Sequence, residues 1–149
     1  YFPDKRAQMR YLFESCNAQP RQCTEDGLAA ANSVDELIVA FNALIDEYLA
    51  LMRLEPAMRD IWSATQTDKS LSKLEIAESR QNGKLLADTI RRIAPGKVSA
   101  QLDETAFLLM HFGESAMRIA VDVSENESNA LIEAYKLMAT RSLRDLMAD

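Results

Sequence analysis

The chain has 149 residues, of which 48% are hydrophobic and 27% are charged, and its net charge is −6. This composition is typical of an ordinary globular protein and excludes a disordered one, while the acidic balance argues against direct binding of this segment to nucleic acid. Glycine and proline occur only 4 times each, and helix-favouring residues dominate, so an all-β fold is also excluded.

The sequence also lacks the segments that send a protein to a membrane. No apolar run approaches the roughly 20 residues that span a bilayer, and no basic segment followed by an apolar one marks a signal peptide. The expected location is therefore the cytoplasm, where Cys16 and Cys23 stay reduced. These cysteines and the single histidine, His111, match no zinc-binding pattern, so we expect no metal and no cofactor.

The first part of the chain predicts one short helix and a connection. Asp4 is a good N-cap for a helix over residues 5–16, and Pro20 is expected to end this helix or to separate it from the next segment. Residues 21–33 show no clear apolar stripe, and we interpret them as a loop or a frayed helical connection.

The clearest helix is predicted over residues 34–53. Its apolar side chains fall on one arc of about 160°, and an arc this wide exceeds the stripe of a surface helix. We therefore expect the helix to lie centrally in the fold. Ser33 followed by Glu36 is a capping-box pattern at its start.

Four more helices are predicted in the rest of the chain. A short helix begins at Pro56 and should bury Met58, Ile61 and Trp62. The others cover about residues 70–93, 99–123 and 127–147, with Asp68 or Ser70 as the cap of the first and Pro95-Gly96 as its stop. The predicted fold is therefore all-α, a multi-helix bundle of five or six helices with short connections.

The last two predicted helices carry more apolar surface than a small monomer can easily cover. In the first, the polar residues occupy only about 100° of arc, and in the second the apolar stripe is about 140° wide. This pattern favours a homodimer that is closed by a four-helix bundle, and the alternative is that both helices pack only within the monomer. The expected interface residues are Leu108, Phe112, Ile119, Leu131, Tyr135, Met138 and Leu143.

No pattern in the sequence points to catalysis. Nucleophilic catalysis needs a base beside an activated serine or cysteine, but His111 adjoins no nucleophile motif. No glycine-rich phosphate or dinucleotide motif occurs. A carboxylate-bridged metal bundle needs Glu-x-x-His on two helices, whereas the chain has one histidine, three residues before Glu114. We therefore expect that the protein is not an enzyme.

A small-molecule cavity among the central helices fits the sequence better. Aromatic and methionine side chains cluster there, as in many apolar pockets, although they could equally fill the core. Glu78 and Gln81 interrupt the apolar stripe of the helix over residues 70–93. Each must be exposed or must meet another helix, water or a ligand, because an unpaired buried polar group costs about 1–3 kcal/mol. The candidate ligand-binding residues are Phe41, Tyr48, Met52, Trp62, Glu78, Gln81, Phe107, Met110 and His111.

The opening residues, Tyr1-Phe2-Pro3-Asp4-Lys5-Arg6-Ala7, resemble the end of the helix-turn-helix of TetR-family transcriptional regulators. In that family an aromatic pair follows the recognition helix, and a serine or aspartate cap and a lysine then open the fourth helix. Gln8 departs from the pattern, because a leucine usually follows nearby. The rest of the chain is similar to the family in architecture, a helical ligand-binding domain whose last two helices pair in a dimer.

The resemblance implies an effector-sensing and dimerisation domain. Residues 1–19 would end the DNA-binding region and form the connecting helix, and residues 20–149 would bind ligand and dimerise. The implied partners are a second copy of the chain, an unidentified small-molecule effector, and operator DNA bound through an N-terminal module outside this chain. Tyr1 and Lys5 would contact DNA phosphate, and a ligand would tilt the connecting helix and shift the spacing of the two DNA-binding heads. The alternative is a dimeric helical adaptor that binds a protein partner.

Overall fold

The computed structural model describes residues 4–96 and 99–148, and over these residues it consists of six helices without strands. The helices are α1 (Lys5–Ala30), α2 (Val34–Leu54), α3 (Pro56–Ala64), α4 (Lys69–Ile93), α5 (Leu102–Ala120) and α6 (Glu125–Leu146). The predicted all-α multi-helix bundle is thus confirmed. None of the described helices combines the length and the apolar character that crossing a membrane requires.

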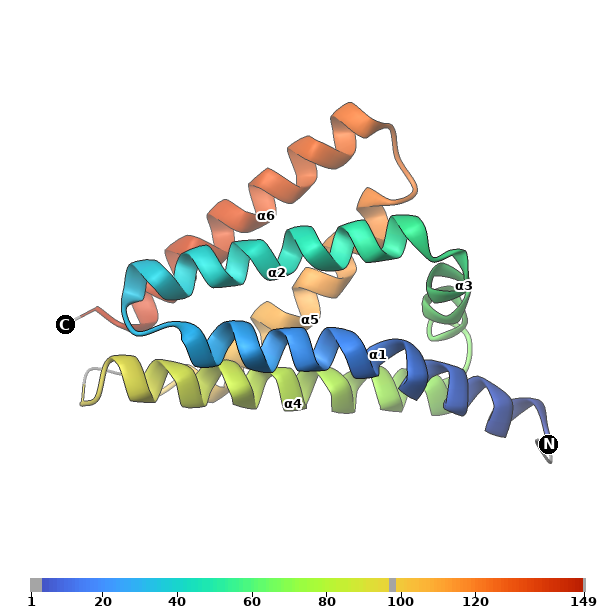
Figure 1. Ribbon diagram of the computed structural model, residues 1–149, viewed down its shortest axis with the longest axis horizontal. Helices are drawn as coiled ribbons and strands as arrows, with labels where there is room; N and C mark the ends of the chain where they lie inside the picture. The colour runs from blue at the N-terminus through green and yellow to red at the C-terminus, as the bar shows by residue number, and fades with distance from the viewer. Residues whose placement is uncertain (1–3, 97–98, 149) are drawn as a thin grey trace.

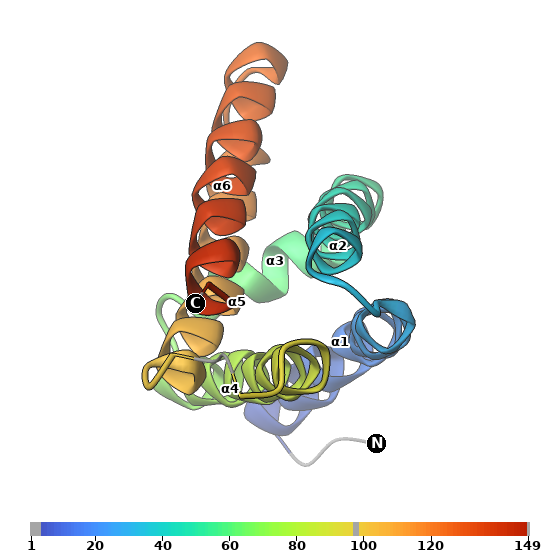
Figure 2. The same ribbon diagram turned by 90° about the vertical axis from the view of Figure 1, so that its left-hand side faces the viewer.

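The helices pack around α5 and α2. Figure 1 shows α1 and α4 running side by side along one edge of the molecule, with α2 next to α1 and the short α3 at one end. In the end view of Figure 2, α5 and α6 form a pair on the side opposite α2. The most extensive contacts join α5 to α4 and to α6, so α5 links the two sides of the bundle.

All six helices contribute to one core. The central helix α2 buries a broad face, as its apolar arc predicts, and Phe41 at its middle is 1% exposed. The predicted burial of Met58, Ile61 and Trp62 on α3 is also confirmed. Fully enclosed side chains on the other helices include Leu28, Leu86, Ala106 and Leu143.

Helix α1 continues through Pro20, so the predictions that a helix ends there and that a loop comes after it are wrong. Proline lacks the N–H that would bond to the carbonyl of the residue four positions earlier, and this normally disfavours an internal position. Packing along the full length of α1 offsets that cost. The buried positions recur every three to four residues and are occupied by Phe13, Asn17, Pro20, Thr24 and Leu28.

The buried face of α1 is not apolar throughout, and its polar members have partners. The Asn17 side-chain amide donates to the Phe13 carbonyl (2.8 Å), and its oxygen accepts from the Tyr48 hydroxyl (2.9 Å). The Thr24 hydroxyl donates to the Pro20 carbonyl (2.9 Å). Because these groups are satisfied internally, they can be buried at little cost. The boundary expected between residues 19 and 20 therefore falls inside a continuous, packed helix.

Side-chain caps set the start of most helices. Asp4, Ser33, Asp68 and Ser124 each accept a hydrogen bond from a main-chain N–H in the first turn of the adjoining helix. The capping pattern at α2 is confirmed in a modified form, since the Glu36 carboxylate accepts from the Asn32 N–H. These local signals explain why most helix starts were predictable to within a few residues.

Helices α4 and α5 touch at Gly83. A Cβ atom placed on Gly83 would lie 2.7 Å from the Cα and 2.9 Å from the N of Phe107. No side chain larger than hydrogen fits at that separation, so glycine permits this close approach of the two backbones. The contact fixes how the polar residues of α4 face those of α5.

Candidate functional site

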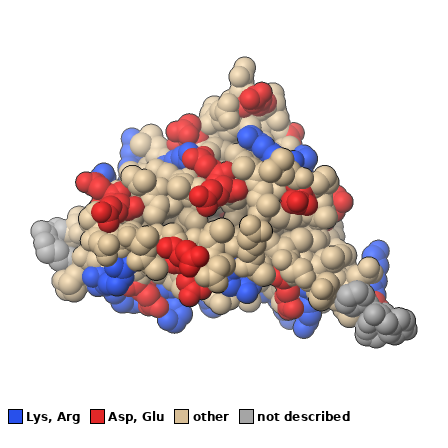
Figure 3. All heavy atoms as spheres, in the orientation of Figure 1, with Lys and Arg blue, Asp and Glu red and all other residues tan. Residues whose placement is uncertain are grey.

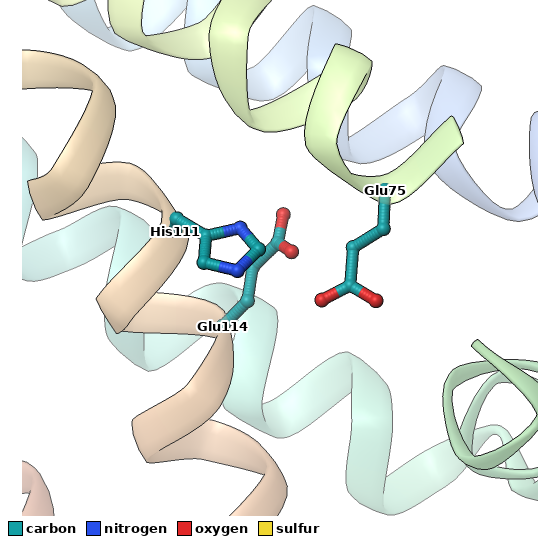
Figure 4. Close-up of side chains that lie close together, drawn as sticks. All are labelled: Glu75, His111 and Glu114. Carbon is teal, nitrogen blue, oxygen red and sulfur yellow. The ribbon is translucent and has the colours of Figure 1, made fainter. Parts of the chain in front are cut away.

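A group of buried and partly buried charged and polar side chains lies where α4 crosses α5. Going from Gly83 toward the start of α4, and from Phe107 toward the end of α5, successive turns of the two helices face each other. Figure 4 shows Glu75 of α4 pointing toward His111 and Glu114 of α5. We call the group the polar cluster, and it consists of Arg21 from α1, Glu75, Glu78 and Ser79 from α4, and His111, Glu114 and Arg118 from α5.

Glu78 is paired with Arg21 across the α1–α4 contact. The guanidinium binds both carboxylate oxygens, with Nε–Oε1 at 3.0 Å and Nη2–Oε2 at 2.5 Å. Glu78 is only 6% exposed. The hydrogen bonds from Arg21 therefore replace those that its carboxylate would make to water. Its hydrogen bond to Glu78 raises the pKa of Arg21. Of the alternatives left open for Glu78, the structure thus supplies a partner from another helix.

Glu75 has its own arginine. The Arg118 Nη1 lies 2.8 Å from the Glu75 Oε1. The Arg118 guanidinium also lies over the Trp62 ring, with its carbon 5.7 Å from the ring centroid, which is a cation–π geometry. Arg118 therefore ties α5 to both α4 and α3.

Glu114 differs from the other two glutamates. It is 8% exposed, and none of the basic side chains in residues 4–96 and 99–148 forms an ion pair with it. Burial raises its pKa to about 8, and the negative charges of Glu75 and Glu78 add to this, while Arg118 and a hydrogen bond with Ser79 act in the opposite direction. Glu114 is thus mainly protonated and neutral at pH 7.

A cavity of about 40 Å³ adjoins the polar cluster, between α1, α2, α4 and α5. Glu114 and Asn82 reach its wall, and the Asn82 Oδ1 is buried without a hydrogen-bond partner among the described residues. Tyr48 also lines it, and burial together with the charge of Glu114 raises the pKa of its hydroxyl well above the usual value. The cavity is therefore apolar with a few polar groups, but its volume is far below the roughly 300–1,000 Å³ of small-molecule sites.

A groove of about 370 Å³ lies between α1 and α2 and shares three wall residues with the cavity, Thr24, Leu44 and Tyr48. Its other wall residues include Pro20 and Leu54. The volume falls in the range of about 300–1,000 Å³ that small-molecule sites occupy. Figure 3 shows the side of the molecule formed by α1, α2 and α4, where both signs of charge are spread among uncharged surface.

The structure brings some of the predicted ligand-binding residues together. Phe41, Tyr48 and Met110 line the cavity. Glu78 and His111 belong to the polar cluster, where the Ser79 hydroxyl lies 2.9 Å from the Nδ1 of His111. These five residues lie in or beside one buried region, and a role for them in ligand binding stays a prediction.

The other predicted ligand-binding residues lie elsewhere. Met52 and Trp62 line a separate hollow beside Arg59 and Arg118. Phe107 lies at a surface hollow between α4 and α5. Gln81 is exposed on α4, because its position on the helix points away from α5 and α1, and so it faces neither cavity nor groove.

Four members of the polar cluster were not predicted from the sequence, namely Arg21, Glu75, Ser79 and Arg118, and Glu114 was considered only as part of a weak metal motif. The available signal was the narrow polar arc of α5. That arc faces α4 over His111, Glu114 and Arg118.

The predicted interface residues divide into two groups. Leu108, Phe112, Ile119 and Met138 are 43–64% exposed, and Leu131 is partly exposed. They form an apolar surface on α5 and α6 that a partner could cover.

The prediction that Tyr135 and Leu143 lie at the interface is corrected, because both side chains lie in the core of the chain itself. Leu143 is 0% exposed, and the Tyr135 hydroxyl donates to the Leu109 carbonyl. The broad apolar stripe of α6 is partly buried in the core and partly exposed on the surface of the chain. Its inner edge packs on α5 and α2. Leu137, at 51% exposure, lies on the outer edge of α6 and is not among the predicted interface residues.

The predicted phosphate contacts lie at the N-terminal end. Tyr1 is outside the residues that the structure describes. Lys5 is the first residue of α1 and is exposed, directly after the N-cap Asp4.

Comparison with known proteins gives one match. A family model described as "Tetracyclin repressor-like, C-terminal domain" matches residues 35–147, a span from α2 to the residue after α6. No curated protein and no solved structure shows a significant match to the chain.

Proposed function

Because the chain belongs to the family of tetracyclin-repressor-like C-terminal domains, we propose that it senses a small-molecule effector and dimerises as part of a DNA-binding transcriptional regulator. The observation that carries this proposal is the groove between α1 and α2, which opens beside a cavity that Glu114 lines. An effector would place its apolar part in the groove and a hydrogen-bonding group near Glu114. Because Glu114 is mainly neutral at pH 7, it can both donate and accept a hydrogen bond.

Dimerisation would use the apolar surface of α5 and α6. Leu108, Phe112 and Ile119 recur on one face of α5, and Leu137 and Met138 extend that surface on α6. Contiguous exposed apolar side chains of this kind mark protein interfaces. Two copies related by a twofold axis would pack these helix pairs into a four-helix bundle.

Coupling to DNA would run through α1. This helix forms one wall of the groove, and its first turn carries Lys5, which we propose contacts DNA phosphate together with Tyr1. Operator DNA would be bound by a helix-turn-helix module preceding α1. An effector that prefers one position of α1 would then favour one spacing of the two modules, and its influence would equal its differential affinity for the two states.

Effector binding is tested by filling the groove. The environment-sensitive dye 1-anilinonaphthalene-8-sulfonate is titrated into the protein and into Ala50→Phe, whose new ring would occupy the groove. The matched control is Ala43→Phe, an exposed position of the same helix outside the groove. We expect at least tenfold weaker binding in Ala50→Phe only. Equal binding by all three proteins would remove the groove as the effector site.

Dimerisation is tested by sedimentation velocity. Phe112→Glu places a charge in the proposed interface and should give a monomer at micromolar concentration. Val39→Glu, at a position of α2 that is 69% exposed, should remain a dimer. A monomeric starting protein, or a dimer that survives Phe112→Glu, would contradict the proposed interface.

A further inference from the structure

The polar cluster contains a set of metal-ligand atoms. Glu75, His111 and Glu114 each offer one nitrogen or oxygen atom, and these three atoms lie within 4.8 Å of one another. Figure 4 shows the three side chains converging from α4 and α5. His111 and Glu114 are three residues apart and therefore share one face of α5. We propose that these three residues bind a divalent transition-metal ion, at a site that lies outside the effector groove and shares Glu114 with the cavity beside it.

The charges around the cluster favour a bound cation. Arg21 and Arg118 are each engaged by one glutamate, Glu78 and Glu75. Glu114 is more than nine-tenths buried, and the described basic side chains leave it without an ion pair. Two guanidinium groups thus serve three glutamates, and an ionised Glu114 would be a buried carboxylate without a counter-charge, which is unfavourable. A metal ion between Glu75 and Glu114 would displace the Glu114 proton to solvent and provide the positive charge that the resulting carboxylate lacks.

The ligand set indicates which class of ion would bind. One imidazole nitrogen and two carboxylate oxygens suit the divalent ions from Mn²⁺ to Zn²⁺, whereas Mg²⁺ and Ca²⁺ prefer oxygen ligands alone. The Ser79 hydroxyl holds the Nδ1 side of the His111 ring at 2.9 Å, and such hydrogen bonds commonly orient metal-binding histidines. Three protein ligands would leave further positions for water.

The geometry requires only a small adjustment. Metal–ligand bonds of about 2.1 Å place neighbouring ligand atoms roughly 3.0–3.5 Å apart, so the side chains would have to close by about an ångström. Glu114 has no ion pair to break. Glu75 can keep its Oε1 on Arg118 and offer its other oxygen to the ion. His111 is half-buried, which gives the ion a path from solvent.

The test is a titration of metal-free protein with Zn²⁺ and, separately, with Mg²⁺. Cys16→Ala and Cys23→Ser are introduced first so that thiols cannot bind the metal. Calorimetry should give one Zn²⁺ per chain and no Mg²⁺ binding. His111→Gln should weaken Zn²⁺ binding at least 100-fold, whereas Glu104→Gln, which replaces an exposed carboxylate of the same helix, should leave it unchanged.

A second measurement needs no variant at the site. His111 is the single histidine of the chain, so its ring protons give isolated NMR signals. Zn²⁺ should shift them and Mn²⁺ should broaden them at stoichiometric amounts. Absence of saturable Zn²⁺ binding, or ring signals that ignore both ions, would overturn the proposal. The groove variant Ala50→Phe should keep its metal affinity, so failure of the effector hypothesis and failure of the metal hypothesis are separable.

Discussion

Replacing Gly83 by alanine is expected to destabilise the protein, although alanine is the better helix former. The substitution gains about 1 kcal/mol in helix propensity. Its Cβ would lie 2.7 Å and 2.9 Å from main-chain atoms of Phe107, whereas favourable carbon contacts are about 3.5–4.0 Å apart. Helices α4 and α5 must therefore separate by about an ångström, since a backbone cannot rotate aside as a side chain can.

The size of the effect depends on these two opposing contributions. Overpacking a filled core costs about 1–3 kcal/mol and occasionally more, and a clash with main chain belongs at the upper end. We expect a net loss of about 2 kcal/mol. Gly27→Ala is the matched control, because its Cβ would lie 3.6 Å from the Leu44 Cδ2, an ordinary contact. That variant should gain up to about 1 kcal/mol.

Urea unfolding followed by circular dichroism, at one fixed protein concentration, measures the free energy of unfolding of both variants. Thermal unfolding gives a second measurement. For a chain of this length, 1 kcal/mol corresponds to roughly 2–4 °C in Tm, so the two alanine variants should shift Tm in opposite directions. If Gly83→Ala were as stable as the parent while Gly27→Ala behaved as expected, α4 and α5 would not approach closely at Gly83. In that case Glu75 and Glu114 would not lie opposite each other across the same helix crossing either.

Three further predictions concern buried and capping charges. In metal-free protein, the free energy of unfolding should fall as pH rises from about 4.5 to about 8. The reason is that the unfolded chain releases the Glu114 proton near pH 4.5, whereas in the folded chain the pKa of Glu114 is about 8. Glu114→Gln should remove this slope, at most about 1.4 kcal/mol per pH unit, in urea unfolding at pH 5–9. Arg118→Met should cost about 3 kcal/mol, since it leaves Glu75 buried without its cation, and adding Glu75→Gln should restore part of the loss. Arg92→Gln should cost about 1 kcal/mol and speed amide exchange at the end of α1, because the guanidinium donates to the Ala31 carbonyl (2.7 Å).

Each of these predictions has a clear contrary result. Identical pH slopes for the parent and Glu114→Gln would mean that Glu114 is ionised or exposed in the folded state. Full stability of Arg118→Met would mean that Glu75 reaches solvent. Unchanged amide exchange in Arg92→Gln would mean that the last turn of α1 does not depend on α4 for its carbonyl partners.

The sequence was most informative where structure depends on neighbours along the chain. The apolar period of residues 34–53, the cap at Ser33 and the proline at the start of α3 each act within a few residues, and each was interpreted correctly. Pro20 was misinterpreted for the opposite reason. Its cost is local, but the packing that offsets it comes from distant helices, and the face that packs includes Asn17 and Thr24, which add nothing to an apolar pattern.

The polar cluster could not be predicted for a related reason. A polar arc on one helix is compatible with solvent or with a polar partner, and the choice depends on what the neighbouring helix presents. Only the crossing at Gly83 aligns the Glu75 turn of α4 with the His111 and Glu114 turns of α5. Sequence periodicity describes each helix separately but not the register between them.

The proline within α1 has a mechanical consequence. Pro20 lines the groove and leaves the Cys16 carbonyl without its usual main-chain donor, while most of residues 5–12 are exposed. At 1.5 Å per residue, Lys5 is about 22 Å along the helix from Pro20. A bend of only about 10° at the proline would displace Lys5 sideways by about 4 Å, so a small change in the groove wall at Pro20 would give a larger displacement at the start of α1.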